Sequence, residues 1–114
     1  MEFKIVNLKE FSPTTEQAIA EMEIELEIAK KSDVKAIKFI HGYGSHGKGG
    51  AISMAVRRHA AWLLKNKKIK FYLSGSEWDL QNERTREIIF ACKNLYGDED
   101  LGHANPGITI IGII

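Results

Sequence analysis

Residues 41–50 combine side chains and backbone types that can hold an anion. The segment reads His-Gly-Tyr-Gly-Ser-His-Gly-Lys-Gly-Gly and stands between an apolar run, typical of a strand, and an amphipathic run, typical of a helix. The start of a helix leaves about four backbone N–H groups unpaired and carries about half a positive charge. Glycines allow that backbone to approach a ligand closely. We therefore predict a phosphate-binding loop here.

Two nucleotide-binding motifs fit this loop only in part. Gly42–Gly47 satisfies the dinucleotide pattern Gly-x-Gly-x-x-Gly, but the next predicted strand carries Lys67–Lys70 where the motif needs an acidic residue for the ribose. Gly42–Lys48 satisfies the Gly-x-x-x-x-Gly-Lys of a P-loop, but Gly49 stands where a Ser or Thr hydroxyl would bind magnesium. Neither motif is complete.

A third interpretation is contact with the sugar–phosphate backbone of a nucleic acid. Basic side chains follow the loop, and its histidines and tyrosine can hydrogen-bond or stack beside phosphates. The same lysines equally suit a solvated connection. The residues predicted to bind the backbone are Gly42, Tyr43, Gly44, Ser45, Gly47, Gly49, Gly50, Arg57 and Arg58. If the strand is cleaved, the groups nearest the scissile phosphate would be His41, His46 and Lys48.

The loop and its surroundings resemble the Smr (small MutS-related) domain family. The matching segments are His41–Gly44, His46–Gly50 with Gly47 where Ser is usual, the helix at Ile52–Leu63, and the turn and strand at Gly102–Ile110. The resemblance covers most of the chain and implies that the partner is DNA or RNA. Several members of the family are endonucleases, so it also implies that this chain could be one, with a divalent metal ion as the cofactor in that case.

One part of the family pattern is replaced in this chain. The first strand of the family usually ends in Leu-Asp-x-His, whose acidic and imidazole groups are linked to nuclease activity. Here the segment reads Val6-Asn7-Leu8-Lys9. An amide cannot act as a carboxylate base, and a lysine does not exchange protons near neutral pH as an imidazole does. We therefore expect nuclease activity to be lost or weakened.

Periodicity and breaker residues predict an α/β fold for the single domain 1–114. The order is β-α-β-α-β-α-β, in two layers with a four-stranded mixed sheet, and the third helix is an addition to the Smr-like core. A helix is predicted to begin with Ser12 as its N-cap and Pro13 as its first residue. Alternatively, Thr14 and Gln17 form a capping box at its start. The other predicted elements are strands at 3–8, 36–41, 69–73 and 107–114 and helices at 50–65 and 78–95.

The segment Glu21–Ile28 alternates strictly between acidic and apolar residues, which favours a strand by period alone. Its Glu and Ala content favours a helix, with Ala18, Ile19, Met22, Leu26 and Ala29 on the inner face. Ile24 and Ile28 then lie on the outer face, either as isolated exposed residues or as a surface for weak self-association.

Composition limits the remaining possibilities. One cysteine excludes an internal disulfide and favours the cytoplasm, and no apolar run approaches the roughly 18 residues of a membrane span. Asp98–Asp100 predicts a solvated acidic loop, with a metal site that includes His103 as the alternative. Two other functions stay open: a small enzyme or sensor that binds a nucleotide or phosphorylated metabolite in the loop, and a protein-interaction module.

Overall fold

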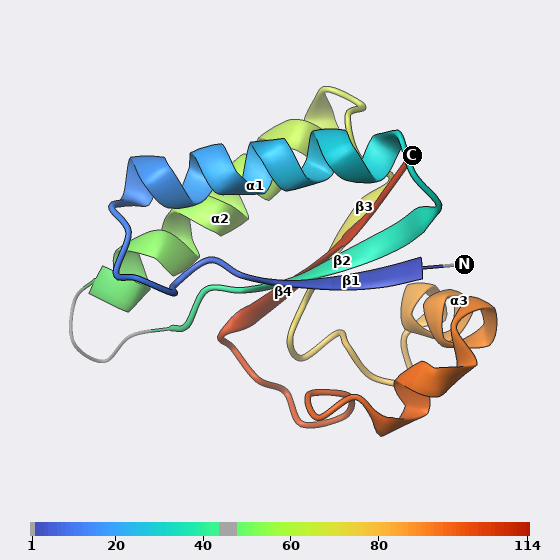
Figure 1. The fold of residues 1–114 in the computed structure, drawn as a ribbon. Coiled ribbons are helices and arrows are strands. Elements are labelled where there is room, and N and C mark those ends of the chain that lie inside the picture. Colours follow the sequence, from blue (N-terminus) through green and yellow to red (C-terminus); the bar gives the residue numbers. More distant parts are fainter. Residues whose placement is uncertain (1, 44–47) are drawn as a thin grey trace.

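A four-stranded mixed sheet forms the centre of the molecule (Figure 1). The computed structural model describes residues 2–43 and 48–114. The strands lie in the order β1-β2-β4-β3 and are β1 (Glu2–Asn7), β2 (Val34–Ile40), β3 (Phe71–Ser74) and β4 (Ile108–Gly112). β1 is parallel to β2, and β4 is antiparallel to both β2 and β3. The predicted mixed sheet and order of elements are confirmed.

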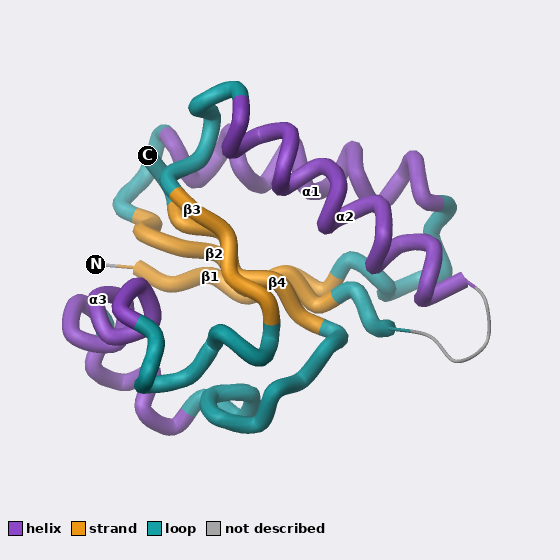
Figure 2. The backbone as a smooth tube through the Cα atoms, turned by 180° about the vertical axis from the view of Figure 1, so that it is seen from behind, coloured by secondary structure: helices purple, strands orange, loops and turns teal. Residues whose placement is uncertain are grey.

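Helices α1 (Thr15–Lys30) and α2 (Lys48–Lys65) cover one face of the sheet (Figure 2). Their apolar stripes pack on side chains from that face, and the predicted inner residues of α1 are buried except Ile19, which is partly buried. This core consists of Val6, Leu8, Ala18, Met22, Leu26, Ala29, Ile37, Phe39, Ile52, Val56, Ala60, Leu63, Ile69 and Ile111. No helix in the described part of the chain is long and apolar enough to cross a bilayer.

The start of α1 decides between the two predicted caps. The Thr14 hydroxyl accepts a hydrogen bond from the Gln17 backbone N–H, and the Gln17 side chain accepts one from the Thr14 N–H. The capping box is therefore confirmed, and the prediction that Ser12 caps the helix is wrong. Ser12 has a φ of +50°, outside the extended conformation that an N-cap adopts.

The connection between β3 and β4 covers the opposite face of the sheet (Figure 1). It contains α3 (Glu83–Ala91) and the 3-10 helix η1 (Lys93–Gly97), and it adds a second core to the layers formed by the sheet with α1 and α2. This core consists of Ala36, Leu73, Trp78, Ile88, Ile89, Cys92, Leu95, Ile108 and Ile110.

The helix predicted at 78–95 is shorter than expected at both ends. Asn82 caps α3 by accepting a hydrogen bond from the Thr85 N–H, and the Thr85 hydroxyl donates to the Glu77 carbonyl. These bonds hold 77–82 in a turn, with Trp78 fully buried. The helix ends at Ala91, and Cys92, whose φ of −129° is not helical, leads into η1. The predicted range was wrong because side-chain capping starts the helix later than its apolar pattern does.

Candidate functional site

The carboxyl ends of the parallel strands β1 and β2 meet the beginning of α2 at one edge of the sheet (Figure 1). Lys9 follows β1, and His41, Gly42 and Tyr43 follow β2. In α/β sheets, ligands bind outside the carboxyl ends of the strands, where a helix N-terminus offers unpaired N–H groups. The described ends of the predicted loop, His41–Tyr43 and the first turn of α2, therefore lie where this architecture can hold an anion.

Lys9 lies against the first glycine of the loop. Gly42 has a φ of +69°, and a Cβ on it would lie 3.5 Å from the Lys9 Cδ. The Asn7 side-chain oxygen accepts a hydrogen bond from the Lys9 backbone N–H at 3.0 Å, and the Leu8 N–H donates to Ile40. These bonds direct the chain after β1 toward the loop. From the sequence, Lys9 was noted only because it replaces the histidine of the family pattern. The structure shows that it also brings a cationic side chain to this edge.

His41 is buried beneath the loop and has both ring nitrogens engaged. Nδ1 lies 2.7 Å from the Gly42 carbonyl oxygen, and Nε2 lies 2.8 Å from the Thr109 hydroxyl. A carbonyl only accepts, so Nδ1 carries the proton and Nε2 accepts from Thr109. Burial lowers the pKa of His41, and the positive charge of Arg57 also lowers it. The hydrogen bond to Gly42 raises the pKa, but by less than burial lowers it. The ring is a neutral link between loop and sheet, and offers no free nitrogen to a scissile phosphate.

The turn at residues 105–107 holds the loop from the other side. The Gly107 carbonyl accepts hydrogen bonds from the His41 and Gly42 N–H groups at 2.9 and 3.0 Å. A Cβ on Gly107 would lie 3.1 Å from the Gly42 Cα, so any other residue here would have to shift Gly42 by a few tenths of an ångström. Arg57 Nη2 donates to the Pro106 carbonyl at 3.1 Å. The turn therefore joins the loop to α2 and brings the Arg57 guanidinium to the site.

Of the other predicted site residues, some lie in the part of the chain that the structure describes and some do not. Tyr43 is exposed over 61% of its surface, and Arg58 is also exposed. Gly49 and Gly50 belong to the first turn of α2, which begins at Lys48. Four predicted site residues lie outside the described residues: Gly44, Ser45, His46 and Gly47.

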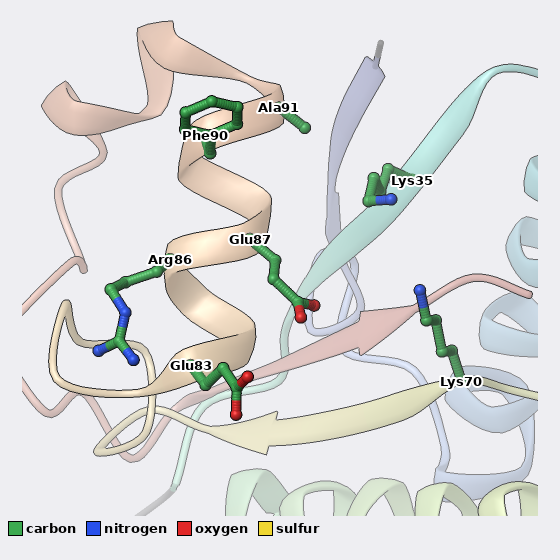
Figure 3. Close-up of a pocket in the computed structure, with 7 residues that line it drawn as sticks. All are labelled: Lys35, Lys70, Glu83, Arg86, Glu87, Phe90 and Ala91. Atoms are coloured by element: carbon green, nitrogen blue, oxygen red, sulfur yellow. The ribbon is translucent and has the colours of Figure 1, made fainter.

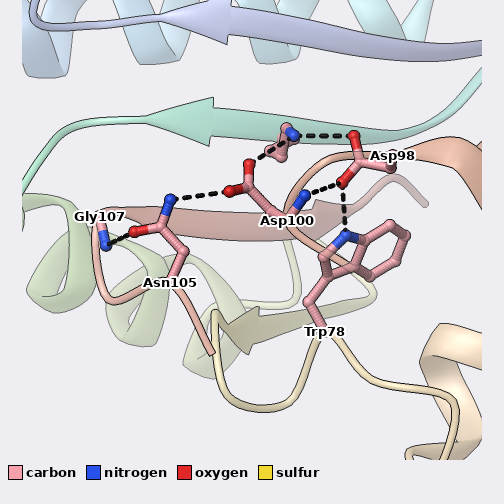
Figure 4. Close-up of polar contacts among 6 residues, drawn as sticks. Trp78, Asp98, Asp100, Asn105 and Gly107 are labelled. Atoms are coloured by element: carbon pink, nitrogen blue, oxygen red, sulfur yellow. Dashed lines mark hydrogen bonds and ion pairs between the residues drawn. The ribbon is translucent and has the colours of Figure 1, made fainter. Parts of the chain in front are cut away.

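A buried charge cluster lies under the sheet, next to this site (Figure 4). Lys38 projects from β2 on the face opposite α1 and α2, with only 1% of its side chain exposed. Its Nζ lies 2.8 Å from Asp98 Oδ1 and 2.7 Å from Asp100 Oδ2. Trp78 Nε1 donates to Asp98 Oδ2 at 2.9 Å. The prediction that Asp98 and Asp100 belong to a solvated loop is therefore wrong, because a buried lysine pairs with them.

The pKa directions follow from these contacts. Burial alone would lower the pKa of Lys38, but the hydrogen bonds and charges of Asp100 and Asp98 outweigh it and raise that pKa. Burial alone would raise the pKa of Asp100, but hydrogen bonds from Asn105 and Lys38 and the lysine charge lower it. Lys38 and Asp100 are therefore charged at neutral pH.

The alternative of a metal site at this cluster is not formed. Within residues 2–43 and 48–114, no three His, Cys, Asp or Glu side chains gather closely enough to hold a metal ion. The carboxylate oxygens of Asp98 and Asp100 instead face the Lys38 ammonium, the Trp78 indole and the Asn105 amide. One buried ammonium thus bridges the acidic pair and offsets one of its two negative charges.

The cluster continues into the turn that holds the loop (Figure 4). Asn105 Nδ2 donates to Asp100 Oδ1 at 2.8 Å, and Asn105 Oδ1 accepts from the Gly107 N–H at 2.8 Å. Since the Gly107 carbonyl binds the Gly42 N–H, a chain of polar contacts runs from Lys38, in the middle of the sheet, to the loop. The cluster positions the site without contributing side chains to its surface.

Two further predictions concern the helices on the other face. Ile24 and Ile28 are exposed on α1, as the helical interpretation of Glu21–Ile28 requires. Self-association through them stays a prediction.

No protein-family model and no curated protein sequence matches the chain. Among solved structures, the fold is similar to the crystal structure of the Smr domain of Thermus thermophilus MutS2, with a TM-score of 0.59 and 18% sequence identity. The match covers 97% of this chain and 98% of that one. At this identity the similarity concerns the fold, and it confirms the Smr-like fold predicted from the residues of the loop.

Proposed function

We propose that this chain, which has the fold of an Smr domain, binds the sugar–phosphate backbone of DNA or RNA at the edge where β1 and β2 end. One observation carries the proposal. Lys9, which follows β1, lies against Gly42, and Arg57 of α2 donates to the Pro106 carbonyl in the turn whose Gly107 carbonyl binds the Gly42 N–H. Two cations from separate segments therefore lie around the start of the glycine-rich loop, and cations beside backbone N–H groups are the chemistry that a phosphodiester needs.

Contacts of this kind favour binding that tolerates any sequence. Lysine, arginine and backbone N–H groups bind phosphate oxygens, which carry no base information. Tyr43 and Arg58 are exposed nearby and can contact a sugar or phosphate. We infer that Gly42–Gly50 supply the N–H groups and that Lys9, Arg57 and Arg58 supply the charge.

The proposed activity is binding, without cleavage by His41. Its ring is buried, neutral and bonded through both nitrogens, and Asn7 and Lys9 replace the acidic and imidazole groups of the Smr strand motif. Strand cleavage would then depend on His46 and Lys48, with a divalent metal ion as cofactor. A nicking assay on single- and double-stranded DNA and RNA, with and without Mg²⁺, tests this, and metal-dependent nicking that survives His46→Ala and Lys48→Ala would contradict it.

A salt titration of binding tests the site itself. For a ligand with many phosphates, the logarithm of affinity falls with the logarithm of salt concentration by about 0.7–0.9 for each phosphate contact. Lys9→Ala, Lys48→Ala and Arg57→Ala should each weaken binding to every sequence and reduce that slope by about one contact. Lys31→Ala is the matched control, because Lys31 is an exposed lysine at the opposite end of α1.

Two results would reject the proposal. Unchanged affinity in Lys9→Ala and Arg57→Ala, with folding intact, would exclude this edge as the contact surface. A shallow slope with saturation at one ligand per chain would instead favour the sensor or enzyme that binds a nucleotide or phosphorylated metabolite. Sedimentation of Ile24→Glu against the unmodified chain separately tests self-association and the protein-interaction function.

A further inference from the structure

A second surface with unusual side chains lies on α3 and η1. Phe90 is exposed over 80% of its surface and Tyr96 over 66%. Together with Leu80, Arg86 and Ile89 they line a cavity of about 280 Å³. We call these five residues the α3 surface. α3 and the beginning of α2 occupy opposite ends of the molecule in both views (Figures 1 and 2).

The fold does not need these aromatic rings. α3 is held to the sheet by Ile88 and Ile89, which are buried in the second core, and by the Asn82 cap. Phe90 follows them on the outer side of the helix, where a polar residue would serve equally well. Exposed apolar side chains that gather around a cavity mark binding sites more often than isolated ones do.

Cations accompany the aromatic rings. Lys93 Nζ lies 6.0 Å from the centre of the Phe90 ring. Arg86 Nη1 donates to the Leu80 carbonyl at 2.9 Å, which fixes the guanidinium and leaves its other N–H groups able to bind an anion. No carboxylate is among the residues that line this cavity.

The neighbouring depression is different in charge. It is lined by residues of both signs, namely Lys35, Lys70, Glu83, Arg86, Glu87, Phe90 and Ala91. In Figure 3, Glu87 points toward the strands that carry Lys35 and Lys70, whereas Arg86 projects from the other side of α3. Glu87 is paired with Arg84, whose Nη1 lies 3.2 Å from Glu87 Oε2, so its charge is offset on α3 itself.

We propose that the α3 surface stacks unpaired bases of a single-stranded nucleic acid, with Arg86 and Lys93 contacting the adjoining phosphates. This proposal rests on the proposed function and specifies its ligand. Aromatic rings beside a cationic edge are the usual means of binding single strands without sequence preference. In a duplex the faces of the bases are covered by their neighbours, so exposed rings of this kind select single strands.

Geometry sets a length requirement on that ligand. The largest dimension of the molecule is 36 Å. A strand that contacts both the beginning of α2 and the α3 surface must span most of that length, which is on the order of ten nucleotides at the 3.4 Å rise of a helically stacked strand and fewer nucleotides in an extended one. A shorter strand should occupy only one of the two surfaces.

Binding of fluorescently labelled oligonucleotides of about 20 nucleotides, single-stranded and duplex, tests the proposal. Phe90→Ala and Tyr96→Ala should each lower affinity for the single strand about tenfold and leave duplex affinity unchanged. Ile28→Ala, which removes an exposed apolar side chain from α1, should change neither. Phe90→Trp should retain single-strand affinity, and its added fluorescence should be quenched when bases stack on it.

The outcomes separate this proposal from the proposed function. If the unmodified chain binds neither single strands nor duplexes at low salt, both fail. If it binds both, and Lys9→Ala weakens binding but Phe90→Ala does not, only the α3 surface is excluded. Loss of affinity for duplex and single strand alike in Phe90→Ala would contradict stacking. Self-association that Phe90→Ala abolishes, without an effect on nucleic-acid binding, would identify the surface as a protein interface and overturn the proposal.

Discussion

The two faces of the sheet are covered in different ways. On one face, α1 and α2 pack regular apolar stripes on Ile37 and Phe39. On the other, a connection of about thirty residues holds one short helix and one 3-10 helix, and its path crosses the buried lysine of β2. The first layer is almost entirely apolar, whereas the second combines an apolar core with an ion cluster.

The contrast has a physical cause. A helix satisfies its own backbone groups, so an apolar stripe is sufficient to fix it to a sheet. An irregular connection has no such repeat, and apolar contacts alone would allow several paths. A buried ion pair gains little net stability, because removing charges from water costs about as much as their attraction returns. We infer that the cluster of Lys38, Asp98 and Asp100 selects one path, and that this path places Gly107 under the loop.

Lys38→Met should have the largest effect on the free energy of unfolding. It leaves two buried carboxylates without their cation, and breaking a buried pair in this way costs about 3–5 kcal/mol. Lys4→Met is the control, since the half-exposed Lys4–Glu25 pair should be worth less than about 1 kcal/mol. Urea unfolding of both variants measures the difference, and equal losses would mean that the cluster does not fix the second layer.

Leu26→Ala tests the opposite face. Leu26 is buried between α1 and the sheet, and its truncation should cost about 3 kcal/mol through lost apolar contact and a cavity. Because no polar chain links it to the 105–107 turn, the variant should keep the affinity for nucleic acid of the unmodified chain at temperatures where it is folded. A change in affinity as large as that of Arg57→Ala would show that both faces control the site.

Asn105→Ala should cost about 1–3 kcal/mol, because it leaves Asp100 Oδ1 and the Gly107 N–H without their partner. It should also speed hydrogen exchange at the His41 and Gly42 amides, which donate to Gly107. Gly75→Ala provides an independent variant, since its Cβ would lie 1.6 Å from the Asn105 carbonyl oxygen and must displace the same turn. Unchanged hydrogen-exchange rates in both variants would contradict the inference that the 105–107 turn holds His41 and Gly42 in place.

Lowering the pH should change the free energy of unfolding the least and the most gradually. The pKa of His41 is lowered in the folded chain, so its contribution to stability is present above its ordinary value of 6.5 and is lost as the pH falls below it. The pKa of Asp100 is also lowered, so its contribution is present above 3.8 and is lost at lower pH. Urea unfolding at a series of pH values measures both.

The same pH series sharpens the comparison of the two faces. Without Lys38, the pKa of Asp100 should rise, because the lysine hydrogen bond and charge are among the causes that lower it. Protonation of this carboxylate should then remove part of the destabilisation of Lys38→Met. The difference in unfolding free energy between Lys38→Met and the unmodified chain should therefore narrow below about pH 4. Leu26→Ala, which involves no titrating group, should show a constant difference, and a constant difference in both would contradict the assigned charges.

Local patterns predicted most of the elements, and they supplied the candidate site as a hypothesis. The glycines and histidines of 41–50 and the Smr resemblance identified the edge at which β1 and β2 end, and the apolar stripe of α1 identified its inner face, including the exposure of Ile24 and Ile28. Patterns of this kind suffice because strand and helix periods decide which side chains face a core. The range of α3 was missed because a cap at Asn82 outweighs an apolar pattern that continues on both sides.

Only the tertiary structure decided the roles of Lys9, Lys38 and His41. In sequence, nothing distinguishes Lys38 from Lys35 in the same strand, and Asp98–Asp100 has the composition of a surface loop. Lys38 and Asp98 are 60 residues apart in the chain. Their pairing, the burial of the His41 ring and the approach of Lys9 to Gly42 all depend on which segments the sheet brings together. A charge is stable in an interior only beside its partner, and the distance between partners is a property of the fold and not of the residues that compose it.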